Sequence, residues 1–421
     1  MKRLIVIVLI IASRLVTAQG VLTLEACQQA AAKNFPLINN QQLYDQTYQV
    51  TCNALKAAFL PSLTVGGQAS WQSSVTSLPI SFPGISIPEM AKDQYKLNLD
   101  ATQLIYDGGL TNINRQLAAV QLAADKNDLA TELYKLRQRI NELYFNANLL
   151  QKQIVITQTM QQSLEARLMV CQSAYANGTT TAAQCQTLKA ELLLLKQRTT
   201  ESESAQNAVA KMLSIYTGLE ITEQMIAEIP AIEHNQLLTI TSRPDYAAFD
   251  FLKTKASLNA KLIRTAKMPK VTGFAQAGYG RPSLNMLSSN FDPYFMLGIR
   301  FNWMLWNWKQ TTNQAEVAEL KTNSIEYSKQ TFAMNIQLQL AAKQAEIRKF
   351  MDLMDADNEL IETRKKISAE AASQFDNGVL QSADLVQRIN EEATAKLNAE
   401  VHKLQLKYAK IMYNELLGVN N

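Results

Sequence analysis

The side chains that most often carry catalysis or bind metals are sparse in this chain of 421 residues. Its two histidines, His234 and His402, lie in different parts of the chain, so a histidine-centred metal site or catalytic triad has little material. The sequence contains no Cys-x-x-Cys pair, phosphate-binding loop or nucleophile elbow. We therefore expect neither an enzyme nor a bound metal or cofactor.

The four cysteines are the remaining reactive side chains, and they are Cys27, Cys52, Cys171 and Cys185. Cys171 and Cys185 lie symmetrically on either side of Gly178, so they could face each other across an antiparallel helical hairpin. In an exported protein such a pair can oxidise to a disulfide. Because spacing alone does not fix disulfide geometry, two packed thiols is the favoured interpretation.

These cysteines lie in a segment whose sequence occurs twice. Residues 97–218 overlay residues 297–418 without a gap at a shift of 200 positions. Upstream, residues 35–63 overlay residues 243–271 at a shift of 208 positions. The matches include Thr111 with Thr311, Gly178 with Gly378, Gly218 with Gly418, Pro61 with Pro269, and Gln68 with Gln276. Because internal repeats outrank local motifs, the sequence predicts two tandem copies of one structural unit, at residues 19–218 and 243–421.

Each copy contains a predicted pair of strands in which apolar and polar residues alternate. The strands are expected at residues 61–72 and 94–104, and at residues 269–280 and 293–304. The pairs are joined by loops at residues 73–93 and 281–292. The alternation gives each strand one apolar face, which would meet lipid in a membrane barrel or a core in a soluble sandwich. Tyrosines and tryptophans near the strand ends favour the barrel.

A long segment without Gly or Pro follows each strand pair, at residues 110–176 and 310–376. At 1.5 Å per residue each would form a helix of roughly 100 Å, which implies coiled-coil packing. An Asn-Gly dipeptide then ends each helix, because Gly adopts the left-handed conformation that stops a helix. The predicted helical hairpins are residues 110–217 and 310–417, and shorter helices at residues 36–58 and 244–267 precede the strand pairs.

Residues 1–18 have the positive, apolar and small-residue regions of a secretory signal peptide. Removing them takes away Lys2, Arg3 and Arg14, which lowers the formal net charge from +4 to about +1. Basic clusters at residues 135–139 and 364–366 lie within helices and favour solvated faces over nucleic-acid sites. No later run of 18 apolar residues predicts a membrane helix. Residues 219–242 are interpreted as a linker forming a small equatorial segment.

Four strands with an apolar exterior face cannot close a membrane barrel, because such barrels begin at about eight strands. Unclosed strand edges are not tolerated in lipid. Two copies of the chain would supply eight strands and three copies twelve. The predicted strands therefore require an oligomer without choosing between these two.

Several features together resemble the TolC-type outer-membrane efflux proteins. They are the helix start at Leu22-Thr23-Leu24-Glu25-Ala26, the two strand pairs, the Tyr106-Asp107-Gly108-Gly109 junction and the twin Asn-Gly tips. The resemblance covers essentially the whole mature chain. It implies a mainly α protein with a β-barrel part, assembled as a homotrimer with a twelve-stranded barrel in the outer membrane and an α-helical tunnel in the periplasm. It also implies docking onto a periplasmic adaptor protein and an inner-membrane transporter.

The resemblance also implies roles for residues near the hairpin tips. In such proteins, acidic residues just after the tips ring the periplasmic entrance, and Asp384 falls on one of these positions. Gln387 and Gln184 stand where acids are common, so the entrance would favour cations less strongly. A solvated carboxylate at a helix start is the alternative for Asp384. The residues expected to meet the adaptor include Asn177, Gly178, Phe375, Asn377, Gly378 and Leu380.

We therefore expect a passive exit duct for small molecules in a tripartite efflux system. An exit duct of a type I protein secretion system has the same architecture and is an alternative. A secreted structural coiled-coil scaffold with a soluble sheet is an alternative of a different class. Dependence on detergent separates the scaffold from the channels, and the identity of the transporter separates the two channels.

Overall fold

A computed structural model describes residues 22–75, 91–222, 226–229, 242–286 and 288–418. The predicted signal peptide, residues 1–18, lies outside the described residues, as do parts of the predicted loop 73–93 and linker 219–242. The chain divides into two compact units. The first comprises residues 1–39, 127–247 and 330–421, and the second comprises residues 40–126 and 248–329. Each unit therefore contains segments from both sequence repeats.

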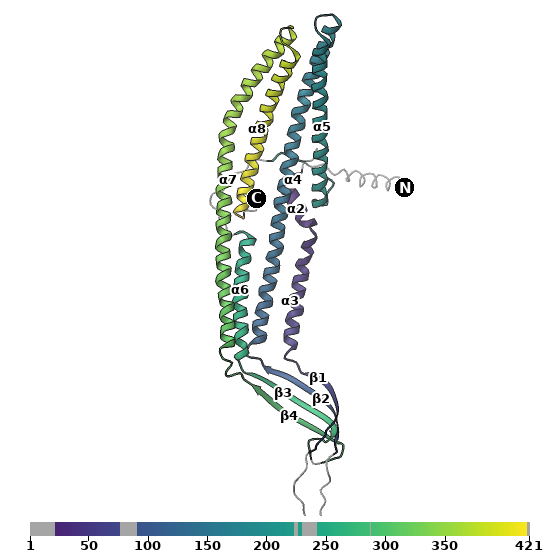
Figure 1. Ribbon diagram of the computed structural model, residues 1–421, viewed down its shortest axis with the longest axis vertical. Coiled ribbons are helices and arrows are strands. Elements are labelled where there is room, and N and C mark those ends of the chain that lie inside the picture. The colour runs from purple at the N-terminus through teal and green to yellow at the C-terminus, as the bar shows by residue number, and fades with distance from the viewer. Residues whose placement is uncertain (1–21, 76–90, 223–225, 230–241, 287, 419–421) are drawn as a thin grey trace, which may run out of the picture. The chain divides into compact units, whose positions relative to one another are not determined.

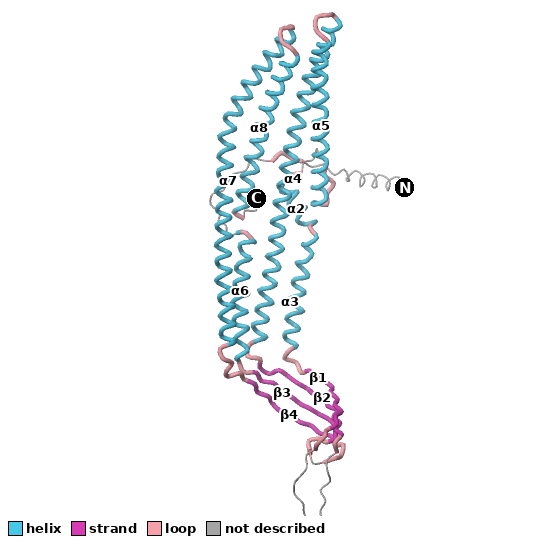
Figure 2. Tube along the Cα trace, in the orientation of Figure 1, coloured by secondary structure: helices cyan, strands magenta, loops and turns pink. Residues whose placement is uncertain are grey.

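The second unit contains a four-stranded antiparallel sheet with the strand order β1-β2-β3-β4 (Figure 2). The strands are β1 (Ser62–Trp71), β2 (Asp93–Tyr106), β3 (Lys270–Arg281) and β4 (Asp292–Asn302). Strands β1 and β4 are the two edges, and each pairs on one side only within the described chain. The trimer and the twelve-stranded barrel thus go beyond what one chain contains.

The strand register follows the duplication. In the first hairpin Ser62 pairs with Thr102, and in the second Lys270 pairs with Asn302. These positions are related by the same shifts of 208 and 200 residues that align the two sequence copies. The two hairpins therefore have equivalent registers.

Strand β2 is longer than its counterpart β4, with 14 residues against 11. The last part of β2 pairs with β3 alone, through Gln103 with Gly273, Leu104 with Thr272 and Tyr106 with Val271. The corresponding residues 303–306 follow β4 and are not in a strand. Residues 303–306 lack, among the described residues, the partner strand that residues 103–106 have in β3.

The junctions from strand to helix differ between the copies. In the first copy the carboxylate of Asp107 accepts hydrogen bonds from the Gly109 nitrogen at 2.9 Å and the Thr111 nitrogen at 2.6 Å. These bonds satisfy backbone donors at the start of α4 (Leu110–Ala176). Gly108 has a φ of 72°, whereas the equivalent Trp308 has a φ of 53°, which side chains larger than Gly rarely adopt. The second junction therefore holds a strained backbone.

Most residues of the shorter helices belong to the second unit. The predicted helix 36–58 begins as a 3-10 turn (Pro36–Asn39) and continues as α3 (Asn40–Ala57). Helix α6 (Pro244–Arg264) continues as a 3-10 turn (Thr265–Lys267). Ion pairs such as Lys253 with Glu326, at 2.7 Å, join α6 to α7 (Gln310–Asp376). Each such exposed pair contributes at most about 1 kcal/mol, so packing holds these helices together.

The first unit contains two helical hairpins and the short helix α2 (Leu24–Asn34), whose N-cap Thr23 accepts a hydrogen bond from the Ala26 nitrogen. One hairpin is formed by α4 and α5 (Ala182–Thr217), and the other by α7 and α8 (Ser382–Leu416). In each hairpin the two helices lie side by side (Figure 1). Helices α4 and α7 have the predicted bounds, and the hairpins end within one residue of the predicted positions 217 and 417.

Two hydrophobic clusters form the core of the first unit. The cluster near the tips joins Leu164, Leu188 and Leu195 of the first hairpin to Phe375 and Leu385 of the second. The other cluster joins α2, α4, α5 and α8 through Cys27, Ala31, Leu136, Ile140, Tyr144, Leu213, Leu404 and Ile411, among others. Each cluster includes residues from both sequence copies.

Candidate functional site

The tip of the first hairpin is a short turn closed by backbone hydrogen bonds. The Gly178 nitrogen donates to the Tyr175 oxygen at 3.0 Å, and the Thr179 nitrogen donates to the Ala174 oxygen at 2.9 Å. Gly178 has a φ of 71°, as a residue that ends a helix in the left-handed conformation does. Asn177 and Gly178 are exposed, and so is the ring of Tyr175. This tip can therefore be reached by another molecule.

The tip of the second hairpin repeats this geometry. The Gly378 nitrogen donates to the Phe375 oxygen at 3.0 Å, and the Asn377 side chain donates to the Ser373 oxygen at 2.8 Å. Asn377, Gly378 and Val379 are exposed, whereas Phe375 is buried and Leu380 is half-buried. Phe375 and Leu380 thus pack into the cluster near the tips. They support the exposed turn from inside.

A disulfide joins Cys171 to Cys185 just behind the first tip, with a Cα–Cα distance of 5.6 Å. The sequence interpretation of two packed thiols is therefore wrong. The antiparallel packing of α4 and α5 brings the two residues to the distance that a disulfide requires. Cys27 and Cys52 are free thiols. At the equivalent positions of the second hairpin stand Ala371 and Leu385, so that hairpin has no such cross-link.

The three predicted entrance residues lie on two different hairpins. Asp384 and Gln387 are exposed and lie about one turn apart near the start of α8. The Gln387 amide donates to the Glu391 carboxylate at 3.0 Å. Gln184 is half-buried on α5 and accepts a hydrogen bond from the Thr180 hydroxyl at 3.1 Å. Within one chain, Asp384 is thus an exposed carboxylate in the first turn of its helix.

Polar contacts that the sequence did not indicate lie more than three helical turns behind the tips. The Asn390 amide of α8 donates to the Glu191 carboxylate of α5 at 3.0 Å, which links the two hairpins. Arg364 of α7 pairs with Glu391 of α8 at 2.5 Å. The hydrogen bond from Gln387 is the main cause that lowers the pKa of Glu391. Arg364 belongs to a basic cluster that the sequence suggested was solvated, and no sequence signal indicates its pairing with a carboxylate on another helix.

A buried polar network lies deeper in the first unit, around Glu415 of α8. The Glu415 carboxylate accepts a hydrogen bond from the Asn141 amide, whose oxygen accepts one from the Gln28 amide at 2.6 Å. Burial raises the pKa of Glu415 to about 7, although the charges of Arg137 and Arg243 act in the opposite direction. The network therefore holds a carboxyl that changes charge near neutral pH.

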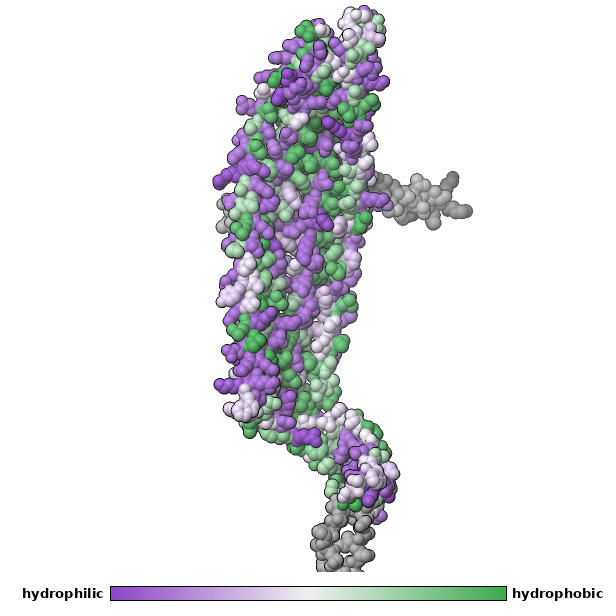
Figure 3. Space-filling model, viewed as in Figure 1, coloured by the Kyte–Doolittle hydropathy of each residue, from purple (hydrophilic) through white to green (hydrophobic). Residues whose placement is uncertain are grey.

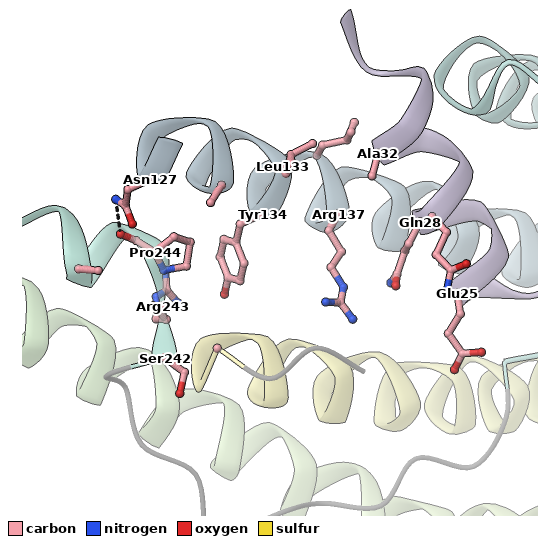
Figure 4. A pocket seen from close by; sticks show the side chains of 15 residues that line it. Glu25, Gln28, Ala32, Asn127, Leu133, Tyr134, Arg137, Ser242, Arg243 and Pro244 are labelled. Atoms are coloured by element: carbon pink, nitrogen blue, oxygen red, sulfur yellow. Dashed lines mark hydrogen bonds between the residues drawn. The ribbon is translucent and has the colours of Figure 1, made fainter. Parts of the chain in front are cut away.

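A pocket of about 670 Å³ lies beside this network. Tyr134, Arg137 and Gln28 extend from α4 and α2 toward α8 (Figure 4). The guanidinium of Arg243 pairs with Asp245 at 2.6 Å and lies 5.0 Å from the centre of the Tyr134 ring. These partners fix Arg243, which is almost fully buried. The hydrogen bonds of Gln28 with Asn141 and of Asn141 with Glu415 link α2, α4 and α8.

The sheet of the second unit exposes one apolar face. The exposed fractions are highest along the edge strand β4, where Phe295 reaches 80% and Leu297 79%. Apolar side chains also lie between hydrophilic ones on the helix surface (Figure 3), and on α7 the exposed Leu320, Tyr327 and Met334 recur every seven residues. Such spacing is typical of a coiled-coil seam. The exposed face of the sheet and the seam on α7 are thus apolar surfaces of the kind that contacts another molecule.

Neither a metal cluster nor a membrane-spanning helix stands out in the described part of the chain. The described residues contain no group of three or more His, Cys, Asp or Glu placed to hold a metal ion. Among the described helices, none combines the length and hydrophobicity needed to cross a bilayer.

Comparison with known proteins shows which family the chain resembles. Residues 27–219 match the family model described as outer membrane efflux protein. The resemblance to TolC-type outer-membrane efflux proteins drawn from the sequence is thereby confirmed. No curated protein is significantly similar to the chain in sequence.

Solved structures share the fold over almost the whole chain. The outer membrane protein VceC from Vibrio cholerae aligns with a TM-score of 0.70 at 14% identity, covering 94% of this chain and 96% of VceC. The channel CusC aligns with a TM-score of 0.73 at 12% identity, covering 94% and 92%. The Campylobacter jejuni outer membrane channel CmeC aligns with a TM-score of 0.69 at 13% identity, covering 94% and 85%. At these identities the likeness concerns the fold.

Proposed function

We propose that this protein is the outer-membrane channel of a tripartite efflux system, a passive exit duct from the periplasm to the exterior. The observation that carries the proposal is the sheet of the second unit. It has an exposed apolar face and two edge strands that have no outer partner among the described residues. In lipid, unpaired backbone groups are costly, so such a sheet is stable only when its edges close with other copies. The efflux protein family and the fold it shares with outer-membrane channels support the same function.

Three copies would close the sheet as a twelve-stranded barrel, and their helical hairpins would form the periplasmic tunnel. The exposed seam of α7 supports contacts between copies, because its apolar residues recur with coiled-coil spacing. In this proposal residues 1–18 direct export and are removed, and residues 19–218 and 243–421 form the two repeats joined by residues 219–242. The barrel lies in the outer membrane, and the chain supplies no chemistry.

The hairpin tips are the proposed contact with a periplasmic adaptor, which connects the duct to an inner-membrane transporter. Their exposed residues, above all Asn177, Gly178, Asn377 and Gly378, support this role because both turns are accessible and closed by backbone hydrogen bonds. Asp384 of each copy would contribute to a ring of three carboxylates at the entrance. Gln387 and Gln184 would make that ring less acidic than three pairs of acids.

The first experiment measures the mass of the mature protein extracted from membranes in detergent, with the detergent contribution subtracted. A mass of three chains, followed by single-channel conductance in planar bilayers, supports the proposal. Recovery of a monomer from aqueous buffer without detergent would refute it and leave the structural scaffold. An exit duct of a type I secretion system is distinguished by cross-linking the tips in cells and identifying the captured transporter.

A further inference from the structure

We propose that the two free edges of the sheet, β4 of one copy and β1 of the next, pair in one specific register that the internal duplication defines. This inference rests on the proposed oligomeric channel and specifies which residues meet between copies. In it, Ile299 lies opposite Ala69 of the neighbouring copy, and Arg300 lies opposite Gln68.

The argument starts from a correspondence that can be checked within one chain. The pair Val65 with Leu99 in the first hairpin becomes Gly273 with Ile299 when the two shifts are applied, and that pair is present in the second hairpin. A side-chain contact repeats in the same way. The Gln103 amide donates to the Phe59 oxygen at 3.3 Å. The equivalent Trp303 indole donates to the Lys267 oxygen at 3.0 Å.

The same shifts, applied to the pairing of β2 with β3, define a pairing of β4 with β1 that one chain cannot make. Leu99 pairs with Ala277, and Asp100 pairs with Gln276. Their equivalents are Ile299 with Ala69 and Arg300 with Gln68. The neighbouring pairs obtained in this way are Leu297 with Trp71 and Phe301 with Gly67.

The side chains brought together by this register are chemically compatible. Each of the four pairs Ile299 with Ala69, Arg300 with Gln68, Leu297 with Trp71 and Phe301 with Gly67 places apolar opposite apolar or polar opposite polar, whereas a slip of one residue would mix the two faces. Phe301 and Ile299 of β4 lie opposite the small residues Gly67 and Ala69 of β1, so the large side chains of β4 cover the part of β1 whose side chains are small. Between β2 and β3 the Gln276 amide donates to the Asp100 carboxylate at 2.5 Å. Arg300 would donate instead to the Gln68 oxygen.

The register also accounts for the short β4. Residues 103–106 are in a strand because they pair with β3, and residues 303–306 would pair in the same way with Leu63, Thr64 and Val65 of the next copy. Leu63 and Val65 are 70% and 74% exposed. The side chains of residues 303–306 are exposed as well. We infer that β4 lengthens to match β2 when copies meet.

The correspondence ends at the helix junction. A Cβ atom on Gly108 would lie 2.4 Å from the Cβ of Met268, so only Gly fits there. The equivalents are Trp308 and Leu60 of the neighbouring copy. Because Trp308 has a Cβ and a large ring, Leu60 must lie farther away than Met268 does. The ring of Trp308, 84% exposed in one chain, would then cover Leu60.

Paired cysteine substitutions test this register in the assembled protein. The background carries Cys27→Ser and Cys52→Ser and keeps the Cys171–Cys185 disulfide. The test pairs are Ile299→Cys with Ala69→Cys and Arg300→Cys with Gln68→Cys. Successive opposed pairs alternate between close and wide spacing, so at least one is within reach of a disulfide. The slipped controls combine Ile299→Cys with Gly67→Cys or with Trp71→Cys, whose Cβ atoms would be about 7–8 Å apart.

The proteins are oxidised in the membrane and separated on denaturing gels without reductant. We expect covalent oligomers from at least one test pair, several-fold above both controls. Stronger cross-linking of a slipped control would overturn the register. Absence of any cross-link, while the parent protein has the mass of an oligomer in detergent, would overturn the pairing and leave the channel intact. A parent protein that is monomeric in aqueous buffer would overturn both proposals.

Discussion

Reduction of the Cys171–Cys185 disulfide should loosen the first hairpin tip and leave the second unchanged. The two cysteines are 14 positions apart, and closing a loop of about 15 residues stabilises a fold by about 3 kcal/mol in the chain-entropy account. Local opening of the segment between them should become easier by this amount. Since 1.4 kcal/mol is a factor of ten, amides that exchange through this opening should exchange roughly a hundredfold faster.

Hydrogen exchange measured by mass spectrometry resolves this effect at the tip. Peptides containing Gly178 and Thr179, whose amides are bonded across the turn, should exchange faster after mild reduction and in a Cys171→Ala, Cys185→Ala variant. The tip around Gly378 is the internal control, because it has an equivalent turn and no disulfide. Unchanged exchange at the first tip, or equal acceleration at both tips, would refute the reasoning.

Three further predictions concern single residues of the first unit. Folding raises the pKa of Glu415 from 4.5 to about 7. Between these two pH values the carboxyl ionises in the unfolded chain but stays protonated in the folded one, so the free energy of unfolding falls by about 3 kcal/mol as pH rises and is constant above pH 7. Glu415→Gln should abolish that pH-dependent decrease in calorimetric melting temperature, and a decrease equal to the parent's would contradict the assignment. Asp384→Asn should lower the cation preference of single channels, and an unchanged preference would leave Asp384 a solvated helix-start carboxylate. Asn390→Ala removes the 3.0 Å bond to Glu191 and should weaken hairpin contact by about 1 kcal/mol, seen as faster exchange in α5 and α8, whereas unaltered exchange would mean that the bond contributes nothing.

The repeated elements could be predicted from sequence because local patterns determine them. Long stretches without Gly or Pro specify α4 and α7, whose bounds agree with the prediction. Alternating apolar and polar residues specify the strands. Gly178 and Gly378 end the helices because each adopts a positive φ, which Gly does at little cost.

Contacts between helices could not be predicted, because a helical pattern indicates which face is buried but not which helix covers it. The Cys171–Cys185 disulfide depends on how α4 and α5 are rotated against each other, which spacing does not give. Arg364 lies in a basic cluster that is typical of a solvated helix face, and its ion pair with Glu391 depends on how α7 packs against α8. The network of Glu415 and Asn141 joins residues far apart in the sequence, and neither lies in a recognisable motif.

The mixed composition of the two hydrophobic clusters limits how the ancestral duplication could be reversed. Leu404 and Ile411 of the second repeat share one cluster with Leu136 and Ile140 of the first. A single repeat expressed alone would therefore lack part of its own interior. A substitution of a cluster residue in one copy therefore changes the packing of the other, so the two copies are complementary halves rather than independent modules.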